Sequence, residues 1–494
     1  MPLVPIVKPS RTLEKSLYLF MKQKEVSLLN TPDSSMTSLA PSSWQQGEVV
    51  EVAIADLNDS GEGVGRFQGR VVFVPDTAPG DRALVRLVKV KPQYAHAKLY
   101  QLLEPSPHRI RPSCIVADKC GGCQWQHISY EYQLEAKRNQ VIQALERIGG
   151  FVNPPVDLIL APPAALGYRN KATYPLNKSA TGQVQAGYYQ KGSHHLINLN
   201  QCPVQDSRLN PLLASVKQDI QKRGWQIYDE RHHQGQVRHL ALRIGRRTGE
   251  MLLTLVVKDW IPGIKAQAQE WLNRYPQLVG VSINRNPERT NVIFGPETRC
   301  IAGQAYLLEQ FAQLQFQVRP DTFFQVYTEA AEALLEAIAQ QLNLQGNEVL
   351  VDAYCGIGSL TLPLAPKVHQ AIGLEVQPAA VEQAQINAQL NNITNANFQA
   401  GEVEKLLPQL GIVPDIVLLD PPRSGCDRTV IQTLLQSAPR HIVYVSCKVA
   451  TLARDLKLLY QGGNYELTRL QPADFFPQTP HVECAAFLTK AVQV

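Results

Sequence analysis

The sequence lacks any apolar segment long enough to cross a membrane. No apolar run approaches the ~18–20 residues that a membrane-spanning helix needs. It also lacks a secretory signal, because no apolar segment near the first residue is followed by a small-residue cleavage site. These absences favour a cytoplasmic protein and give no reason to expect a membrane partner.

An excess of charge of one sign is also missing. The 48 Lys and Arg residues against 43 Asp and Glu leave a formal net charge of +5 over 494 residues. Such a value is weak evidence for an anionic partner, because solvated lysines alone can produce it. The length predicts about two to four domains. Residues 1–46, in which Ser, Thr and Pro gather without periodicity, predict a disordered tail.

Residues 47–105 follow the pattern of a small β-barrel of the OB type. Short segments rich in β-branched residues are separated by glycine turns, and Gly61 to Arg66 has the composition of a hairpin. The strands are expected at residues 48–52, 70–74 and 83–90. Another kind of small β-barrel is the alternative.

The next residues, 106–318, predict a central α+β domain. A group of cysteines comes first, a helix is expected from Tyr130 to Ile148, and strands then alternate with polar turns. Two basic segments, Arg169 to Lys171 and Arg243 to Arg247, fit either an RNA contact or a solvated face.

Strands and helices alternate from residue 319 to residue 494. A helix is expected over 328–343, and the apolar runs between the helices are short. Such runs are typical of buried parallel strands, so this region predicts a doubly wound, Rossmann-like α/β domain. The strands are expected at residues 348–352, 371–375, 416–420 and 441–446.

Three strand ends in this domain indicate a bound nucleoside. The segment Asp352 to Ser359 ends a strand and opens a helix, and its glycines let a ligand approach the backbone. The next strand ends in Glu375, a carboxylate that can accept hydrogen bonds from both ribose hydroxyls. Asp420-Pro421-Pro422 forms a stiff loop after a third strand. Because the third glycine of the dinucleotide fingerprint is missing, S-adenosylmethionine fits better than a dinucleotide.

Two further residues have the chemistry and the placement of catalytic groups. Cys447 follows an apolar strand at the rim of the same sheet, where a cysteine can act as a nucleophile. A buried structural cysteine is the alternative. Glu483 lies among apolar residues near the chain end, and is either a surface carboxylate at a strand edge or a base whose pKa is raised by its neighbours.

Three of the nine cysteines lie close together in the sequence. Cys114, Cys120 and Cys123 have Cys202, in a Cys-Pro pair, as a candidate fourth ligand. Thiolates at this spacing suit an iron–sulfur cluster, with structural zinc as the alternative. The C-x3-C-x2-C spacing of radical S-adenosylmethionine enzymes is absent.

Together these motifs resemble the RNA uracil-5-methyltransferase family, and within it the iron–sulfur members that act on 23S ribosomal RNA. The resemblance covers residues 47–494. It implies that residues 47–105 form a TRAM domain, an RNA-binding barrel. It also implies a [4Fe–4S] cluster, held by Cys114, Cys120, Cys123 and Cys202.

The resemblance further implies roles for single residues. Cys447, after Tyr444-Val445-Ser446, matches the nucleophile of the family, and Glu483, after Asp474-Phe475-Phe476-Pro477, matches its general base. The cofactor site would be formed by Gln325, Tyr354, Glu375 and Asp420.

Two positions depart from the family pattern. Lys448 and Val449 follow the cysteine where the family has Asn-Pro, and Tyr327 stands two residues after Gln325 where the family has Asn. These departures concern the local loop shape and the RNA target, and leave the reaction class unchanged.

The implied activity is transfer of a methyl group from S-adenosylmethionine to C5 of a uridine, with 23S rRNA as the expected substrate. The enzyme is expected to be a monomer. A tRNA methyltransferase is one alternative, and a non-catalytic RNA-binding or assembly factor is a second, which the intact Cys447 and Glu483 disfavour. A cytosine-5-methyltransferase is disfavoured because Pro421 is followed by Pro422 and not by a cysteine.

Overall fold

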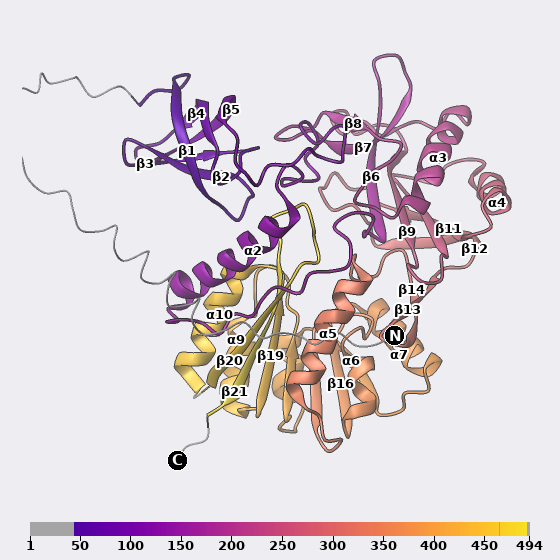
Figure 1. Cartoon of the computed structure of the whole chain (residues 1–494). Helices are drawn as coiled ribbons and strands as arrows, with labels where there is room; N and C mark the ends of the chain where they lie inside the picture. Colours follow the sequence, from indigo (N-terminus) through magenta and orange to yellow (C-terminus); the bar gives the residue numbers. More distant parts are fainter. Residues whose placement is uncertain (1–43, 464, 492–494) are drawn as a thin grey trace, which may run out of the picture. The chain divides into compact units, whose positions relative to one another are not determined.

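The computed structural model describes residues 44–463 and 465–491 (Figure 1). Most of the tail predicted at residues 1–46 lies outside the described residues. Within these ranges, no helix has the length and apolar character to span a membrane. All contacts discussed below lie within residues 46–494, which cluster as one unit.

Five strands close into a barrel, as predicted for residues 47–105. They are β1 (Val49–Leu57), β2 (Gly63–Phe67), β3 (Arg70–Val74), β4 (Arg82–Val90) and β5 (Tyr94–Glu104), paired in the order β1-β2-β3-β5-β4. Alternate residues of β1, among them Val50, Val52 and Ile54, are buried in the barrel. The interior is narrow, since a Cβ added to Gly65 would lie 2.2 Å from Val52 Cγ1.

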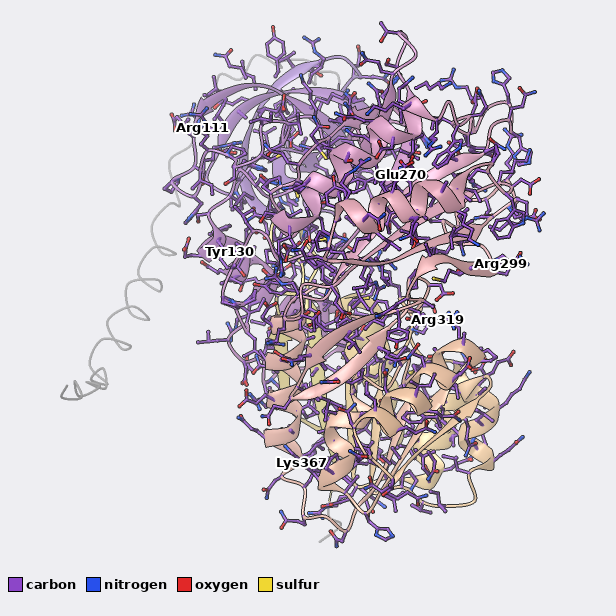
Figure 2. All side chains as sticks on the ribbon, turned by 90° about the vertical axis from the view of Figure 1, so that its right-hand side faces the viewer. Arg111, Tyr130, Glu270, Arg299, Arg319 and Lys367 are labelled. Carbon is purple, nitrogen blue, oxygen red and sulfur yellow. The ribbon has the colours of Figure 1, made fainter. Side chains whose placement is uncertain are left out.

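A seven-stranded sheet forms the centre of the second domain. Its strands are β6 (Lys171–Lys178), β7 (Val184–Tyr189), β8 (Leu196–Asn198), β9 (Val237–Ile244), β10 (Met251–Val257), β11 (Leu278–Arg285) and β12 (Glu297–Gly303), in the order β12-β11-β10-β9-β6-β7-β8. Helices α3 (Asn210–Lys222) and α4 (Ile264–Arg274) bury Leu213, Ile220 and Trp271 against it. Figure 2 shows these two helices side by side over the sheet, with Glu270 on α4.

A second seven-stranded sheet confirms the predicted doubly wound domain. A hairpin, β13 (Leu307–Phe311) and β14 (Leu314–Val318), precedes it. The sheet order is β17-β16-β15-β18-β19-β21-β20, in which the strands up to β19 are parallel and β21 runs antiparallel between β19 and β20. The elements are α5 (Thr328–Leu342), β15 (Val349–Ala353), α6 (Thr361–Leu364), β16 (Gln370–Glu375), α7 (Pro378–Leu390), β17 (Ala396–Ala400), α8 (Val403–Leu406), β18 (Ile416–Leu419), α9 (Arg428–Ser437), β19 (His441–Ser446), α10 (Val449–Gly463), β20 (Tyr465–Ala473) and β21 (Glu483–Lys490).

The predicted domain boundaries differ from the packing at one helix. Helix α2 (Tyr130–Ala144), followed by one π turn (Leu145–Gly149), falls in the predicted central domain. Its Val141 and the following Leu145 are nevertheless buried in the core between the C-terminal sheet and α9 and α10. After this helix, Val156 forms a parallel β-bridge with Leu470 of β20. The end of this helix therefore packs with the C-terminal domain, whereas its Ala136 lies in a cluster with Leu57 and Ala78 of the barrel region.

Candidate active site

Cys447 and Glu483 lie at the paired ends of two neighbouring strands. Strands β19 and β21 are antiparallel, and their last pair is Ser446 with Cys484. Cys447 and Glu483 stand one residue beyond this pair, so the strand register brings the thiol and the carboxyl to adjacent positions. Glu483 is only 4% exposed, whereas Cys447 is partly exposed.

Arg423 joins these two residues, and no prediction assigned it a role. Its side chain hydrogen-bonds the Cys447 thiol and interacts with Glu483. Burial and then Glu483 raise the pKa of Cys447, and Arg423 opposes that change. Burial and then Asp420 raise the pKa of Glu483 well above its ordinary value, again opposed by Arg423. The sequence signal that could have identified Arg423 is its position directly after Asp420-Pro421-Pro422.

A pocket of about 300 Å³, here called the Cys447 pocket, opens beside the thiol. Cys447, Lys448 and His481 line it from the C-terminal domain, and Asn58 and Asp59 line it from the turn between β1 and β2. Lys448 Nζ lies 2.8 Å from Asp59 Oδ2. The lysine that departs from the family pattern therefore links the barrel to the rim of this pocket.

The loop that leads to Glu483 is held from two sides. Asp474 is fully buried and pairs with the buried Lys137 of α2 at 2.6 Å. Further along, the backbone oxygen of Gln478 accepts hydrogen bonds from the N–H groups of residues 124 and 125, at 3.1 and 3.0 Å. The position of the carboxyl therefore depends on α2 and on the segment that directly follows the clustered cysteines.

Tyr354, Glu375 and Asp420 come together at one edge of the C-terminal sheet. They stand at the carboxyl ends of the neighbouring parallel strands β15, β16 and β18. Glu375 Oε2 accepts a hydrogen bond from the N–H of Gly356 at 3.1 Å, so the carboxylate lies against the glycine loop. Tyr354 has a left-handed backbone, with φ of 73°, which starts this loop.

Asp352 adds a further carboxyl to this edge. It is buried, and its Oδ2 accepts a hydrogen bond from Thr361 Oγ1 at 2.5 Å. Its Oδ1 is buried and has no partner among the described residues. Burial raises the pKa of Asp352 to about 7, and burial likewise raises the pKa of Asp420 to about 7. A ligand with cationic or hydrogen-bond donor groups would stabilise the charged form of these carboxyls.

Gln325 lies on a separate segment, between β14 and α5. Its backbone oxygen accepts a hydrogen bond from Asn170 Nδ2 at 2.8 Å. Nearby Tyr327 is buried, donates its hydroxyl to Ala164 O at 2.7 Å, and stacks on Tyr168 with ring centroids 4.8 Å apart. The tyrosine that replaces the family's Asn therefore fastens this segment to the central domain.

The four cysteines singled out in the sequence line one cavity of about 60 Å³. All four are free thiols, and burial raises the pKa of Cys123 to about 11. In residues 44–463 and 465–491, no three or more His, Cys, Asp or Glu side chains are grouped so that they could hold a metal ion. A four-iron cluster would take one thiolate at each iron. The thiols available for it in this cavity are those of Cys114, Cys120, Cys123 and Cys202.

Among the described residues that line this cavity, Arg169 has the basic side chain and none is an Asp or a Glu. Its Nε is buried and has no hydrogen-bond partner in the part of the chain that the structure describes. The thiols of Cys123 and Cys202 interact electrostatically with its guanidinium. A buried N–H without an acceptor is unfavourable unless a negative group is near. A negatively charged group in the cavity would stabilise this part of the guanidinium.

Within the second basic segment, Arg243 serves packing, whereas Arg247 is exposed, as the solvated-face alternative expects. Arg243 is buried, and its Nη2 donates to Thr322 O at 2.8 Å. Arg247 Nη1 lies 2.7 Å from Glu332 Oε1 on α5. These arginines join the central sheet to the segment before α5 and to α5 itself.

Two family models match the chain. The TRAM domain model matches residues 43–100, and the model of tRNA (Uracil-5-)-methyltransferase matches residues 129–407 and 412–491. The TRAM match contains β1 to β4 and most of β5, and the methyltransferase match contains Cys447, Glu483 and the strand-end carboxyls.

Relatives cover nearly the whole chain. An uncharacterized RNA methyltransferase of Nostoc sp. is 75% identical over 451 residues, which are 91% of this chain and 98% of the relative. One of Bacillus cereus is 39% identical over 450 residues, or 90% and 97%. The solved structure of Pyrococcus abyssi tRNA (uracil-54, C5)-methyltransferase in complex with S-adenosyl-L-homocysteine has 26% identity and a TM-score of 0.72, covering 89% of this chain and all of that one.

Proposed function

The chain belongs to the tRNA (uracil-5-)-methyltransferase family, and from this premise we propose that it methylates C5 of a uridine in 23S rRNA with S-adenosylmethionine as the methyl donor. The observation that carries the proposal is the meeting of Cys447 and Glu483 at paired strand ends beside a pocket. The cysteine group, which resembles that of the rRNA-directed members, favours rRNA as the substrate.

The proposed mechanism has three steps. The Cys447 thiolate adds to C6 of uracil, which breaks the C5–C6 double bond and makes C5 nucleophilic. C5 then takes the methyl group from the sulfonium, and S-adenosylhomocysteine is released. Glu483 removes the C5 proton, the double bond re-forms, and Cys447 leaves C6 as a thiolate. Arg423 favours the thiolate form, because it hydrogen-bonds the sulfur and is positively charged.

The target base must leave its stack before Cys447 can reach C6. Enzymes that act on bases accept an unstacking free energy of a few kcal/mol and offset it with contacts to the nucleic acid. The Cys447 pocket lies between the barrel turn and the nucleophile, so it is the proposed place for the extruded uracil.

S-adenosylmethionine is proposed to lie at the edge formed by Tyr354, Glu375 and Asp420, with Gln325 contributing from its own segment. The acidic residues there, Asp352 included, suit a ligand that carries an ammonium and a sulfonium group. The related Pyrococcus abyssi enzyme was solved with S-adenosyl-L-homocysteine, which supports the choice of S-adenosylmethionine as the methyl donor.

Glu375→Ala should weaken S-adenosylmethionine binding by roughly 1–3 kcal/mol, because a charged acceptor for the ribose hydroxyls is lost. Isothermal titration calorimetry of the two proteins measures this difference. Glu348→Ala, at an exposed carboxylate just before β15, is the matched control and should bind as the wild type does. Equal affinities for Glu375→Ala and wild type would place the ribose elsewhere.

A [4Fe–4S] cluster is proposed at Cys114, Cys120, Cys123 and Cys202. The shared cavity and the buried, unpartnered Nε of the half-buried Arg169 support it, because an all-thiolate cluster carries net negative charge. No step of methyl transfer requires iron. The cluster is proposed to order the segment after Cys123, whose backbone holds the loop that leads to Glu483.

Protein purified without oxygen should be brown and contain about four irons and four sulfides per chain. Cys202→Ser should lower both contents, because one thiolate ligand is lost, whereas Cys300→Ser on the exposed strand β12 should not. Iron and sulfide assays with absorption spectra measure this. One zinc per chain without sulfide would assign the cavity to structural zinc.

The substrate is tested by mass mapping of RNA from cells that lack the protein. One 5-methyluridine should disappear from 23S rRNA and return when the gene is restored. Disappearance from tRNA instead would support the second candidate, which the likeness to the Pyrococcus abyssi tRNA enzyme favours. Unchanged 5-methyluridine in both RNAs would contradict the proposed function.

A further inference from the structure

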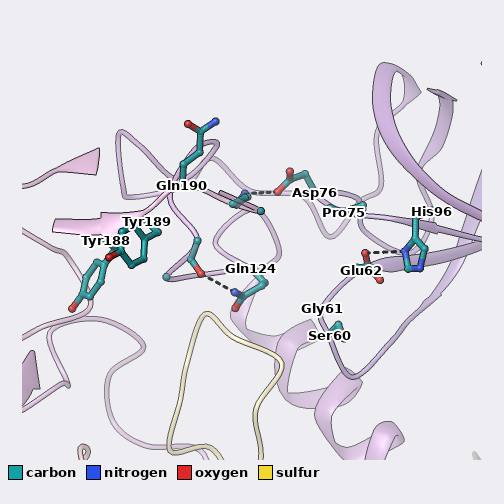
Figure 3. Close-up of a pocket in the computed structure, with 14 residues that line it drawn as sticks. Ser60, Gly61, Glu62, Pro75, Asp76, His96, Gln124, Tyr188, Tyr189 and Gln190 are labelled. Carbon is teal, nitrogen blue, oxygen red and sulfur yellow. Dashed lines mark hydrogen bonds and ion pairs between the residues drawn. The ribbon is translucent and has the colours of Figure 1, made fainter. Parts of the chain in front are cut away.

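A second pocket, of about 640 Å³, lies between the barrel and the loop that contains Cys120 and Cys123 (Figure 3). Its volume falls in the range of roughly 300–1,000 Å³ that is typical of ligand sites. Figure 3 shows Tyr188 and Tyr189 on one side of the pocket, and His96 with Glu62 on the other. The backbone of Gly121 and Gly122 forms part of the wall. We call it the barrel pocket.

The barrel pocket and the Cys447 pocket share one wall. The turn between β1 and β2 places Asn58 and Asp59 in the Cys447 pocket, and places the next residues, Ser60 to Glu62, in the barrel pocket. The tip of this turn is fixed, because Trp125 Nε1 donates a hydrogen bond to Gly61 O at 3.1 Å. An RNA strand that enters the Cys447 pocket on the side of Asn58 and Asp59 would therefore pass this tip, next to the barrel pocket.

The charges of the barrel pocket suit a base better than a phosphate. Among the lining residues, Lys191 carries the positively charged side chain. Its Nζ lies 2.5 Å from Asp76 Oδ1 and 2.9 Å from Ala117 O, so this charge is already paired. His96 faces Glu62, with Nδ1 3.6 Å from Oε1. A phosphate would meet two carboxylates and no uncompensated lysine or arginine there, which is unfavourable. Aromatic rings and side-chain amides are instead what proteins use to hold an unstacked base.

We propose that the barrel pocket binds the base of a second RNA nucleotide, close in sequence to the methylated uridine, against the partly exposed ring of Tyr189. The proposal rests on the proposed function, since the RNA is the one that the Cys447 pocket would receive. Tyr189 is the candidate stacking residue because it is 39% exposed, whereas Tyr188 also lines the cysteine cavity. Gln124 offers an amide at the same wall.

The experiment uses the full-length holoenzyme and whichever unmodified RNA the wild type methylates, 23S rRNA or tRNA transcript. Tyr189→Ala should raise the Kd for this RNA by roughly 5- to 100-fold, the range for removing a stacked aromatic ring. Tyr189→Phe should restore binding. The salt dependence of Kd should keep its slope, because no phosphate contact is lost. At saturating RNA, kcat should be close to that of the wild type.

Two further variants separate binding from folding. Ser60→Trp places a bulky side chain at the exposed rim of the pocket, and should weaken RNA binding without removing any lining ring. Tyr460→Ala, at an exposed tyrosine of α10 outside the pocket, is the matched control and should bind RNA normally. All variants should bind S-adenosylmethionine with the wild-type Kd, which verifies that they are folded.

Wild-type RNA affinity in both Tyr189→Ala and Ser60→Trp would overturn the inference while leaving the proposed function intact. A weaker affinity with a smaller salt slope would also overturn it, because the pocket would then hold a phosphate. Normal binding of naked RNA together with poor methylation of ribosomal particles would assign the pocket to a protein partner instead. If the wild type methylates neither RNA, the proposed function itself fails, and the inference with it.

Discussion

Cys447→Ala should abolish methylation, with a loss of at least about 10⁴-fold, the scale on which enzymes lose rate when a covalent nucleophile is removed. Without a thiolate at the end of β19, nothing adds to C6, and C5 remains a poor nucleophile toward the sulfonium. Transfer of labelled methyl groups to substrate RNA measures the rate. A denaturing gel should show no covalent protein–RNA band at any time.

The controls for Cys447→Ala distinguish chemistry from folding. The variant should bind S-adenosylmethionine and RNA as the wild type does, because the cofactor edge and the barrel keep their contacts. Cys300→Ala, which removes an exposed thiol on β12, should keep full activity. A loss much smaller than 10⁴-fold would exclude Cys447 as the nucleophile. Cys355, in the glycine loop, would then be the next thiol to test.

Glu483→Gln should stop the reaction one step later, after the methyl group has been transferred. Addition of Cys447 and methyl transfer need no base, but elimination needs a group that accepts the C5 proton, and glutamine cannot do so. The variant should therefore accumulate a covalent protein–RNA adduct that already carries the methyl group. Burial makes Glu483 a stronger base than an exposed carboxylate, since it raises the pKa of the carboxyl.

The adduct is detected as a slow band on a denaturing gel, labelled from the methyl group of S-adenosylmethionine. Glu483→Asp, which shortens the side chain but keeps a carboxyl, should turn over slowly and give less adduct than Glu483→Gln. The double variant Cys447→Ala with Glu483→Gln should give none. Normal turnover by Glu483→Gln would assign proton removal to another group, for which the neighbouring Asp420 is the first candidate.

The strand-end motifs could be predicted from the sequence because each is a local pattern. An apolar run that ends in an acid, a glycine loop or a cysteine specifies both a buried strand and the rim where its last residue lies. Glu375 and Asp420 were identified in this way, and the structure brings them to one edge of the sheet. Cys114, Cys120 and Cys123 were likewise found by spacing, and Cys202 was added from its Cys-Pro pair; all four line one cavity.

The meeting of Cys447 and Glu483 could not be derived from any local pattern. It depends on β21 entering the sheet between β19 and β20, so that residues 36 positions apart become neighbours. The placement of α2 and the pairing of Arg247 with Glu332 are long-range in the same sense. Periodicity identifies an amphipathic helix or a basic segment, but does not specify which distant surface it contacts.

The insertion of β21 also has a consequence for the order of events during synthesis. This strand is the last in sequence among residues 44–463 and 465–491, yet it occupies an inner place in the sheet. Until it has left the ribosome, β19 and β20 have no strand between them, and the proposed catalytic carboxyl is absent although the cofactor loop and the thiol are already made. A nascent chain therefore gains the proposed catalytic pair only after β21 has been made and has paired with β19.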